Sequence, residues 1–137
     1  TFFVWAIRDL DSAALQRVQI VKGWIVNNQL KENVDDVVCS DGLKVDPLTN
    51  RCPDTGAKVD NETCSISNNG ANELSSFWSD PDFDKDTRAF YYVRVLENPT
   101  CRWSTWDAIR EGVSPRPDMQ KTIQERAWSS PIHLLNG

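Results

Sequence analysis

The segment "RAFYYVRVLE", residues 88–97, constrains the fold of this chain more than any other. Its apolar side chains fall on both alternations of an extended chain, with Phe90 and Tyr92 on one face and Tyr91 and Val93 on the other. Successive strand residues point to opposite faces of a sheet, so this strand needs apolar neighbours on both sides. The segment therefore predicts a central strand of a layered β protein.

Several other segments combine β-branched and aromatic residues with turn residues at their ends, which predicts further strands. They are residues 1–9, 17–26, 34–42, 72–80 and 122–135. Residues 27–33 are turn-like and join the second and third of these segments into an antiparallel hairpin. The pattern favours an all-β fold, an antiparallel β-sandwich of the immunoglobulin or fibronectin kind.

One short helix is expected beside these strands. Ser104 is a candidate N-cap, Asp107 follows three residues later, and Gly112 is a C-terminal stop. The helix would make about two turns.

The four cysteines are Cys39, Cys52, Cys64 and Cys101. None forms a C-x-x-C pair and the chain has a single histidine, so zinc spacing is absent. An even count favours two disulfides and an oxidising compartment, with buried free thiols as the alternative. Four cysteines allow three connectivities, of which we favour Cys52–Cys64 and Cys39–Cys101.

Residues 43–72 are rich in Pro, Gly, Asn, Asp and Thr and contain few apolar side chains. Such a long segment is too loose for a packed domain unless it is held in place. We expect a long irregular loop that disulfides pin to the body of the protein.

Length and charge limit the function classes. The 137 residues are enough for one domain, 1–137, with a real core. A net charge of −5 argues against nucleic acid as a main partner, and no apolar run is long enough for a membrane span. The chain opens inside a strand, without Met or signal peptide, which favours a C-terminal fragment of a longer protein.

The stretch "SDPDFDKD" raises the question of a calcium site. Asp80, Asp82 and Asp84 match the first three ligand positions of a calcium loop, but Lys85 and Tyr91 replace its Gly and its bidentate acid. We interpret the stretch as a polar turn, with calcium binding as the weaker alternative.

No residue of the chain is assigned a catalytic role. There is no G-x-S-x-G elbow and no phosphate loop, and the lone His133 has no evident partner.

The tryptophans supply the remaining candidates. Trp5, Trp24 and Trp128 lie within predicted strands and are expected to fill the core. Arg102, Trp103 and Trp106 surround the start of the short helix and are better surface candidates. We expect them to contact a neighbouring domain, or alternatively a ligand.

Three ordered stretches carry a family resemblance: "VQIVKGW", "SDPDFDKDTRAFYYVRVLENPTCRWSTWDA" and "TIQERAWSSPI". They resemble the C-terminal region of a bacterial family called domain of unknown function 3604. Its members are longer, and their bulk resembles the polymerase-and-histidinol-phosphatase superfamily of metal-dependent phosphoesterases. The resemblance implies an exported protein, periplasmic or extracellular. It places the metal ligands upstream, so no cofactor is expected in this chain and a divalent metal only in the upstream part.

Two functions follow as expectations. In the first, the chain is a non-catalytic C-terminal β-sandwich that packs on an upstream catalytic domain, its partner, and shapes the entrance to that domain. The chain alone would then not be an enzyme. In the second, it is an autonomous module that binds carbohydrate or protein.

Overall fold

The extended segments pair into antiparallel sheets in the computed structural model, which describes residues 1–134. The chain is mostly β with one short helix, as the alternation predicts. Its elements in chain order are β1 (Phe2–Ile7), β2 (Leu15–Val26), β3 (Gln29–Cys39), β4 (Glu73–Trp78), β5 (Ala89–Glu97), β6 (Thr100–Cys101), α1 (Trp103–Glu111), β7 (Thr122–Ile123), β8 (Arg126–Trp128) and β9 (Ile132–Leu134).

A large sheet with the order β3-β2-β5-β8 forms the centre of the molecule, and β9 also pairs with β5. The predicted central strand is confirmed, because β5 has strand neighbours on both edges. The hairpin of β2 and β3 is longer than expected, since β3 already begins at Gln29. Asn27 and Asn28 both have positive φ, 50° and 60°, so two residues suffice for the turn that we expected over 27–33.

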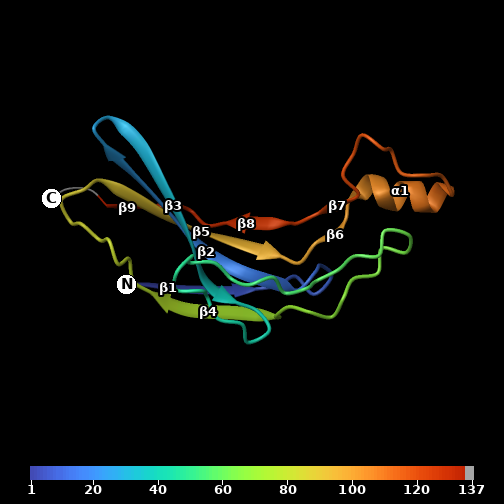
Figure 1. Ribbon diagram of the computed structural model, residues 1–137, viewed down its shortest axis with the longest axis horizontal. Helices are drawn as coiled ribbons and strands as arrows, with labels where there is room; N and C mark the ends of the chain where they lie inside the picture. Colours follow the sequence, from blue (N-terminus) through green and yellow to red (C-terminus); the bar gives the residue numbers. More distant parts are fainter. Residues whose placement is uncertain (135–137) are drawn as a thin grey trace.

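A small sheet of β1 and β4 packs on one face of the large sheet (Figure 1). Its inward side chains include Val4 and Leu74, which join Val18, Ile20 and Tyr91 in the buried core. Burying apolar surface between the two sheets is the main stabilising term of the fold.

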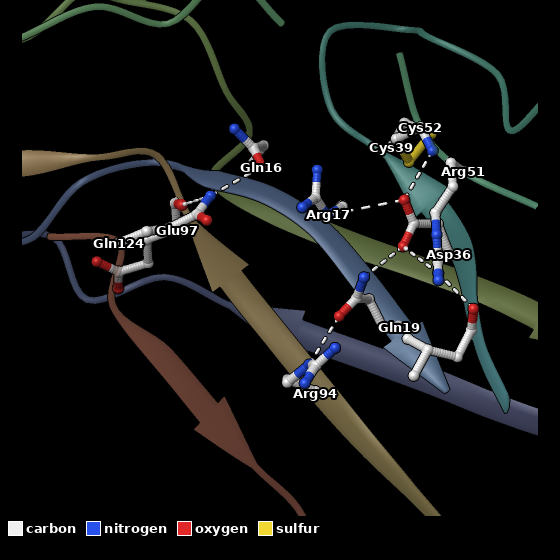
Figure 2. A network of polar contacts seen from close by, with 11 residues as sticks. Gln16, Arg17, Gln19, Asp36, Cys39, Arg51, Cys52, Arg94, Glu97 and Gln124 are labelled. Atoms are coloured by element: carbon white, nitrogen blue, oxygen red, sulfur yellow. Dashed lines mark hydrogen bonds and ion pairs between the residues drawn. A yellow bond between two sulfur atoms is a disulfide. The ribbon is translucent and has the colours of Figure 1, made fainter. Parts of the chain in front are cut away.

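The opposite face of the large sheet carries a buried carboxylate, Asp36, which is only 3% exposed. Gln19 Nε2 and the backbone N–H of Cys52 donate hydrogen bonds to it, at 2.5 and 2.7 Å. The guanidinium groups of Arg17 and Arg51 lie 3.7 Å from its oxygens (Figure 2). A buried charge is tolerated only when it is paired and hydrogen-bonded. These contacts therefore fasten the start of the long loop to β3.

Two disulfides are present, and their pairing differs from the one that we favoured. Cys39 pairs with Cys52 and Cys64 with Cys101, with Cα–Cα distances of 5.7 and 5.6 Å. The hydrogen bond from Cys52 to Asp36 brings Cys52 back beside the end of β3, where Cys39 is the near partner. Cys64 lies further along the loop and reaches β6, which contains Cys101.

The segment 43–72 has no regular strand in the described structure, only isolated bridges. These bridges join Asp46 to Arg51, Val59 to Ile66 and Leu15 to Ala71. With so little strand pairing, the segment is held by the disulfides, by the Asp36 contacts and by hydrogen bonds from the Gly70 N–H to Asp41 and from the Asn98 amide to the Asn69 carbonyl.

Helix α1 begins at Trp103, so the predicted N-cap at Ser104 is wrong. Arg102 holds the N-cap position with extended backbone, and the Thr105 hydroxyl donates to the Lys121 carbonyl at 2.7 Å. Gly112 is confirmed as the C-terminal stop, because its φ of 65° is the left-handed conformation that glycine adopts easily. Within residues 1–134, no helix has the length and apolar character needed to cross a bilayer.

The last predicted strand is broken into β7, β8 and β9. Between β8 and β9, the Ser129 N–H donates to the Val93 carbonyl, while the Ser129 hydroxyl oxygen accepts the Val93 N–H. Pro131 has no N–H to continue the ladder.

Peptide mapping under non-reducing conditions tests the disulfide pairing. Trypsin cleaves after Lys44, Arg51 and Lys58 and after Arg94 and Arg102, which places each cysteine on its own peptide. We expect the Cys39 peptide to be linked to the Cys52 peptide and the Cys64 peptide to the Cys101 peptide. A Cys52–Cys64 link would contradict the structure.

Replacing Cys64 and Cys101 by serine should lower the free energy of unfolding by about 4 kcal/mol, measured in urea.

Candidate interaction surface

The small sheet is apolar on the face that points away from the core as well as on the inner face. Phe3, Trp5 and Ile7 alternate with the core residues of β1 and are 59%, 60% and 61% exposed. Phe77 of β4 is 74% exposed and packs on Phe3, with ring centroids 4.8 Å apart. We call Phe3, Trp5, Ile7 and Phe77 the outer face. A strand pair with apolar residues on both faces is typical of a sheet that is covered on both sides.

The outer face is held in a fixed arrangement. β1 and β4 pair along their full lengths, with Phe3 opposite Phe77 and Ile7 opposite Glu73. The indole N–H of Trp5 donates to the Glu73 carboxylate at 2.7 Å. The paired backbones of β1 and β4 thus hold the aromatic side chains in fixed positions. Such a surface loses little conformational entropy when it binds a partner.

A groove runs along the side of β1 that is not paired with β4. Its volume is about 460 Å³. The β1 residues Phe3 and Trp5 line one side, and Val93, Val95 and Ala127 of β5 and β8 line the other. The groove lies at the side of the small sheet that faces β8. β4 lies over β2 and β3 and β1 over β2, although Phe2 at the start of β1 also packs on Tyr91 of β5.

The aspartate turn is anchored by an interaction that is distant in sequence. Asp80 accepts a hydrogen bond from the Lys22 ammonium at 2.5 Å and another from the Tyr91 hydroxyl at 2.6 Å. Lys22 also donates to the Asp82 carbonyl at 2.9 Å and lies over the Trp24 ring. The Lys22 and Asp80 side chains are only 12% and 6% exposed, so this pair closes the end of the core.

Burial and hydrogen bonding act in opposite directions on the pKa of Asp80 and in the same direction on the pKa of Tyr91. Burial raises the pKa of the Asp80 carboxyl, but hydrogen bonds from Lys22 and Tyr91 outweigh it, so the pKa lies below the usual 3.8. Burial and the neighbouring Asp80 carboxylate raise the pKa of Tyr91 above its usual value. Asp80 is therefore ionised and Tyr91 neutral near pH 7.

Two of the three aspartates of the possible calcium loop, Asp80 and Asp84, bind different partners. Asp80 bonds Lys22 and Tyr91, while Asp84 accepts the Asp86 N–H at 2.9 Å and the Thr87 hydroxyl at 2.8 Å. Within residues 1–134, no group of three or more His, Cys, Asp or Glu side chains is placed to hold a metal ion. The stretch has the hydrogen bonds of a polar turn.

A second hollow lies above this turn. Its volume is about 470 Å³, and Trp24 and Tyr91 line it together with Glu32, Asn33 and Asp82. An aromatic wall beside carboxylate and amide groups suits a polar, hydroxylated ligand.

The residues around α1 lie at the opposite end of the molecule from the N-terminus (Figure 1). Trp103 is 69% and Trp106 40% exposed, and both line a shallow hollow with Arg110. Arg102 precedes them, and its backbone N–H donates to the Lys121 carbonyl at 2.9 Å. The structure thus exposes both predicted tryptophans but does not bring them near the outer face.

Sequence reasoning missed Phe3, Ile7 and Phe77 and placed Trp5 and Trp128 in the core. In the structure Trp5 and Trp128 are 60% and 59% exposed, whereas Trp24 packs against the core as expected. The signal was the run "FFVWAI", in which both alternations are apolar, so a second apolar face was readable from the same pattern used for residues 88–97.

Fold and surface together define an antiparallel, disulfide-linked β protein with an uncovered apolar face. The family model described as "Protein of unknown function (DUF3604)" matches residues 1–136, and the chain belongs to that family. This confirms the resemblance to that family, whereas the relation to metal-dependent phosphoesterases stays a prediction. No curated protein and no solved structure matches the chain.

Removing the Asp80 charge tests the anchor of the turn. Asp80→Asn should lower the free energy of unfolding by about 2 kcal/mol near pH 7, because Lys22 loses its buried partner. The folded pKa of Asp80 is below 3.8, so its stabilising effect is complete above that pH and declines as the pH falls further. The difference between the variant and the wild type should shrink in urea titrations below about pH 3.8.

Asp82→Asn is the matched control, because Lys22 contacts the backbone carbonyl of Asp82 and the substitution leaves that group in place. Equal destabilisation by the two variants would contradict this account.

Proposed function

We propose that this chain is a non-catalytic β-sandwich of the immunoglobulin or fibronectin kind that packs against the catalytic part of a longer protein. The observation that carries the proposal is the outer face, which gives the small sheet two apolar sides. The exposed parts of its four side chains amount to roughly 400–500 Å². Patches of this size on soluble proteins often mark interaction sites.

The nature of the catalytic part rests on the family resemblance. The longer protein would be a metal-dependent phosphoesterase-like enzyme whose metal ligands lie upstream of this chain. The present chain would contribute stability and shape to that enzyme. Its two disulfides indicate an oxidising compartment, and the exported character of the family makes this compartment the periplasm or the extracellular space.

The surface around Trp103 and Trp106 is a second candidate for the domain contact. Both side chains are exposed, but the charged residues Asp107 and Arg110 lie beside them. The outer face is larger and more apolar, which is typical of a permanent contact.

Side-chain footprinting tests which surface is buried in the longer protein. Hydroxyl-radical labelling of Trp5 and Phe77 should be at least fivefold lower in the full-length protein than in the 137-residue chain. Trp103 should be labelled equally in both, and it serves as the internal control. Protection of Trp103 with unchanged labelling of Trp5 and Phe77 would move the contact to α1. A full-length reading frame without an upstream domain would overturn the proposal.

The polar hollow favours a second candidate function, an autonomous carbohydrate-binding module, because Trp24 and Tyr91 line it beside polar groups. Titration of the isolated chain with oligosaccharides should then change the tryptophan fluorescence of the wild type but not of Trp24→Phe. Trp103→Phe is the matched control and should keep the response. The proposal of a domain contact predicts instead no saturable change in the wild type, since Lys22 and Asp80 already satisfy one another at this hollow.

A further inference from the structure

We propose that the groove beside β1 receives an extended strand from the upstream part of the longer protein. This strand would pair with the free edge of β1 and cover β5 and β8. The inference rests on the proposed function and adds the form of the partner: a backbone segment with apolar residues at alternate positions.

The backbone of β1 has one edge that is not paired with β4. Opposite residues of an antiparallel pair alternate between those that exchange hydrogen bonds and those that do not. The Arg8 N–H donates to the Asn72 carbonyl at 3.0 Å, directly after the pair formed by Ile7 and Glu73. By alternation, the N–H and C=O groups of Phe3, Trp5 and Ile7 point away from β4. Within residues 1–134, no strand pairs with this edge of β1. Edges of this kind are templates for strand addition.

The floor of the groove is apolar. The side chains of Val93, Val95 and Ala127 face the same side of the large sheet as the core. Val93 and Val95 pack against the edge of the core, and all three side chains line the groove. A strand added to β1 at the usual spacing of about 4.8 Å would project every second side chain onto them.

A second copy of this chain is the competing occupant, because two free β1 edges could pair with each other. The two occupants differ in one measurable respect: pairing between copies would protect the β1 amides of the 137-residue chain in a concentration-dependent way.

The charges specify the occupant further. Glu97 and Glu125 both line one end of the groove, and the Glu97 N–H donates to the Glu125 carbonyl at 3.1 Å. The Ser12 hydroxyl donates to one oxygen of the Glu97 carboxylate. Arg126 lines the same groove, so its charged side chains carry one net negative charge, which complements a Lys or Arg. The added strand should therefore carry a basic residue at that end.

Amide hydrogen exchange at single-residue resolution tests the inference in the full-length protein and in the 137-residue chain. The amides of Phe3, Trp5 and Ile7 should exchange at least tenfold more slowly in the full-length protein. Concentration-dependent protection in the 137-residue chain would identify a second copy as the occupant and overturn the proposal. Equal exchange in the two proteins would also overturn it.

Two substitutions in the full-length protein separate this inference from the proposed function. Ala127→Arg fills the groove and should abolish the added protection of the β1 amides. Ser75→Arg places the same group on the exposed side of β4, so it should restore radical labelling of Phe77 and leave the β1 amides protected. Amide protection that survives Ala127→Arg would mean that the strand does not lie in the groove. Loss of footprint protection alone would refute only the packing of the outer face.

Discussion

The unequal width of the two packed sheets determines most of what is distinctive about this protein. A two-stranded sheet cannot fully cover four strands. The core is closed over β2 and around Tyr91 of β5, whereas Val93, Val95 and Ala127 line an open groove. The same narrow sheet has apolar side chains on both faces, which leaves Phe3 and Trp5 exposed. The groove and the outer face both lie along β1. One additional body that contacts β1 would bury both.

On the opposite face of the large sheet, polar contacts rather than apolar packing hold the long loop, residues 43–72, in place. Asp36 is buried in a position where only several donors make a charge tolerable. Arg51 and the backbone of Cys52 supply part of that requirement from the loop, and Arg51 also donates to the Val34 carbonyl. The same contacts therefore order the loop and neutralise part of the charge on the Asp36 carboxylate. A loop with few apolar residues obtains its order in this way.

Local pattern was sufficient for some features and insufficient for others. The strands around Val93 and Val4 were predictable because their alternation is visible in consecutive residues. Contacts between distant residues were not: Lys22 and Asp80 are 58 positions apart, and nothing in the aspartate stretch indicates its partner. The disulfide pairing was equally hidden, since three connectivities fit the same spacing. For Trp5, a segment that is apolar at every position does not reveal which alternation faces the core.

The disulfide arrangement has a further consequence for the covalent continuity of the chain. The loops closed by the two bonds follow one another along the sequence, from Cys39 to Cys52 and from Cys64 to Cys101. A backbone cut inside either loop leaves one covalently joined molecule. A cut at exposed Lys58, between the two loops, instead yields two separate chains, one with β1 to β3 and the other with β4 to β9. Only interstrand hydrogen bonds and the shared core would then keep the halves together, so a proteolytic cut within residues 53–63 has a consequence that a cut inside either loop does not.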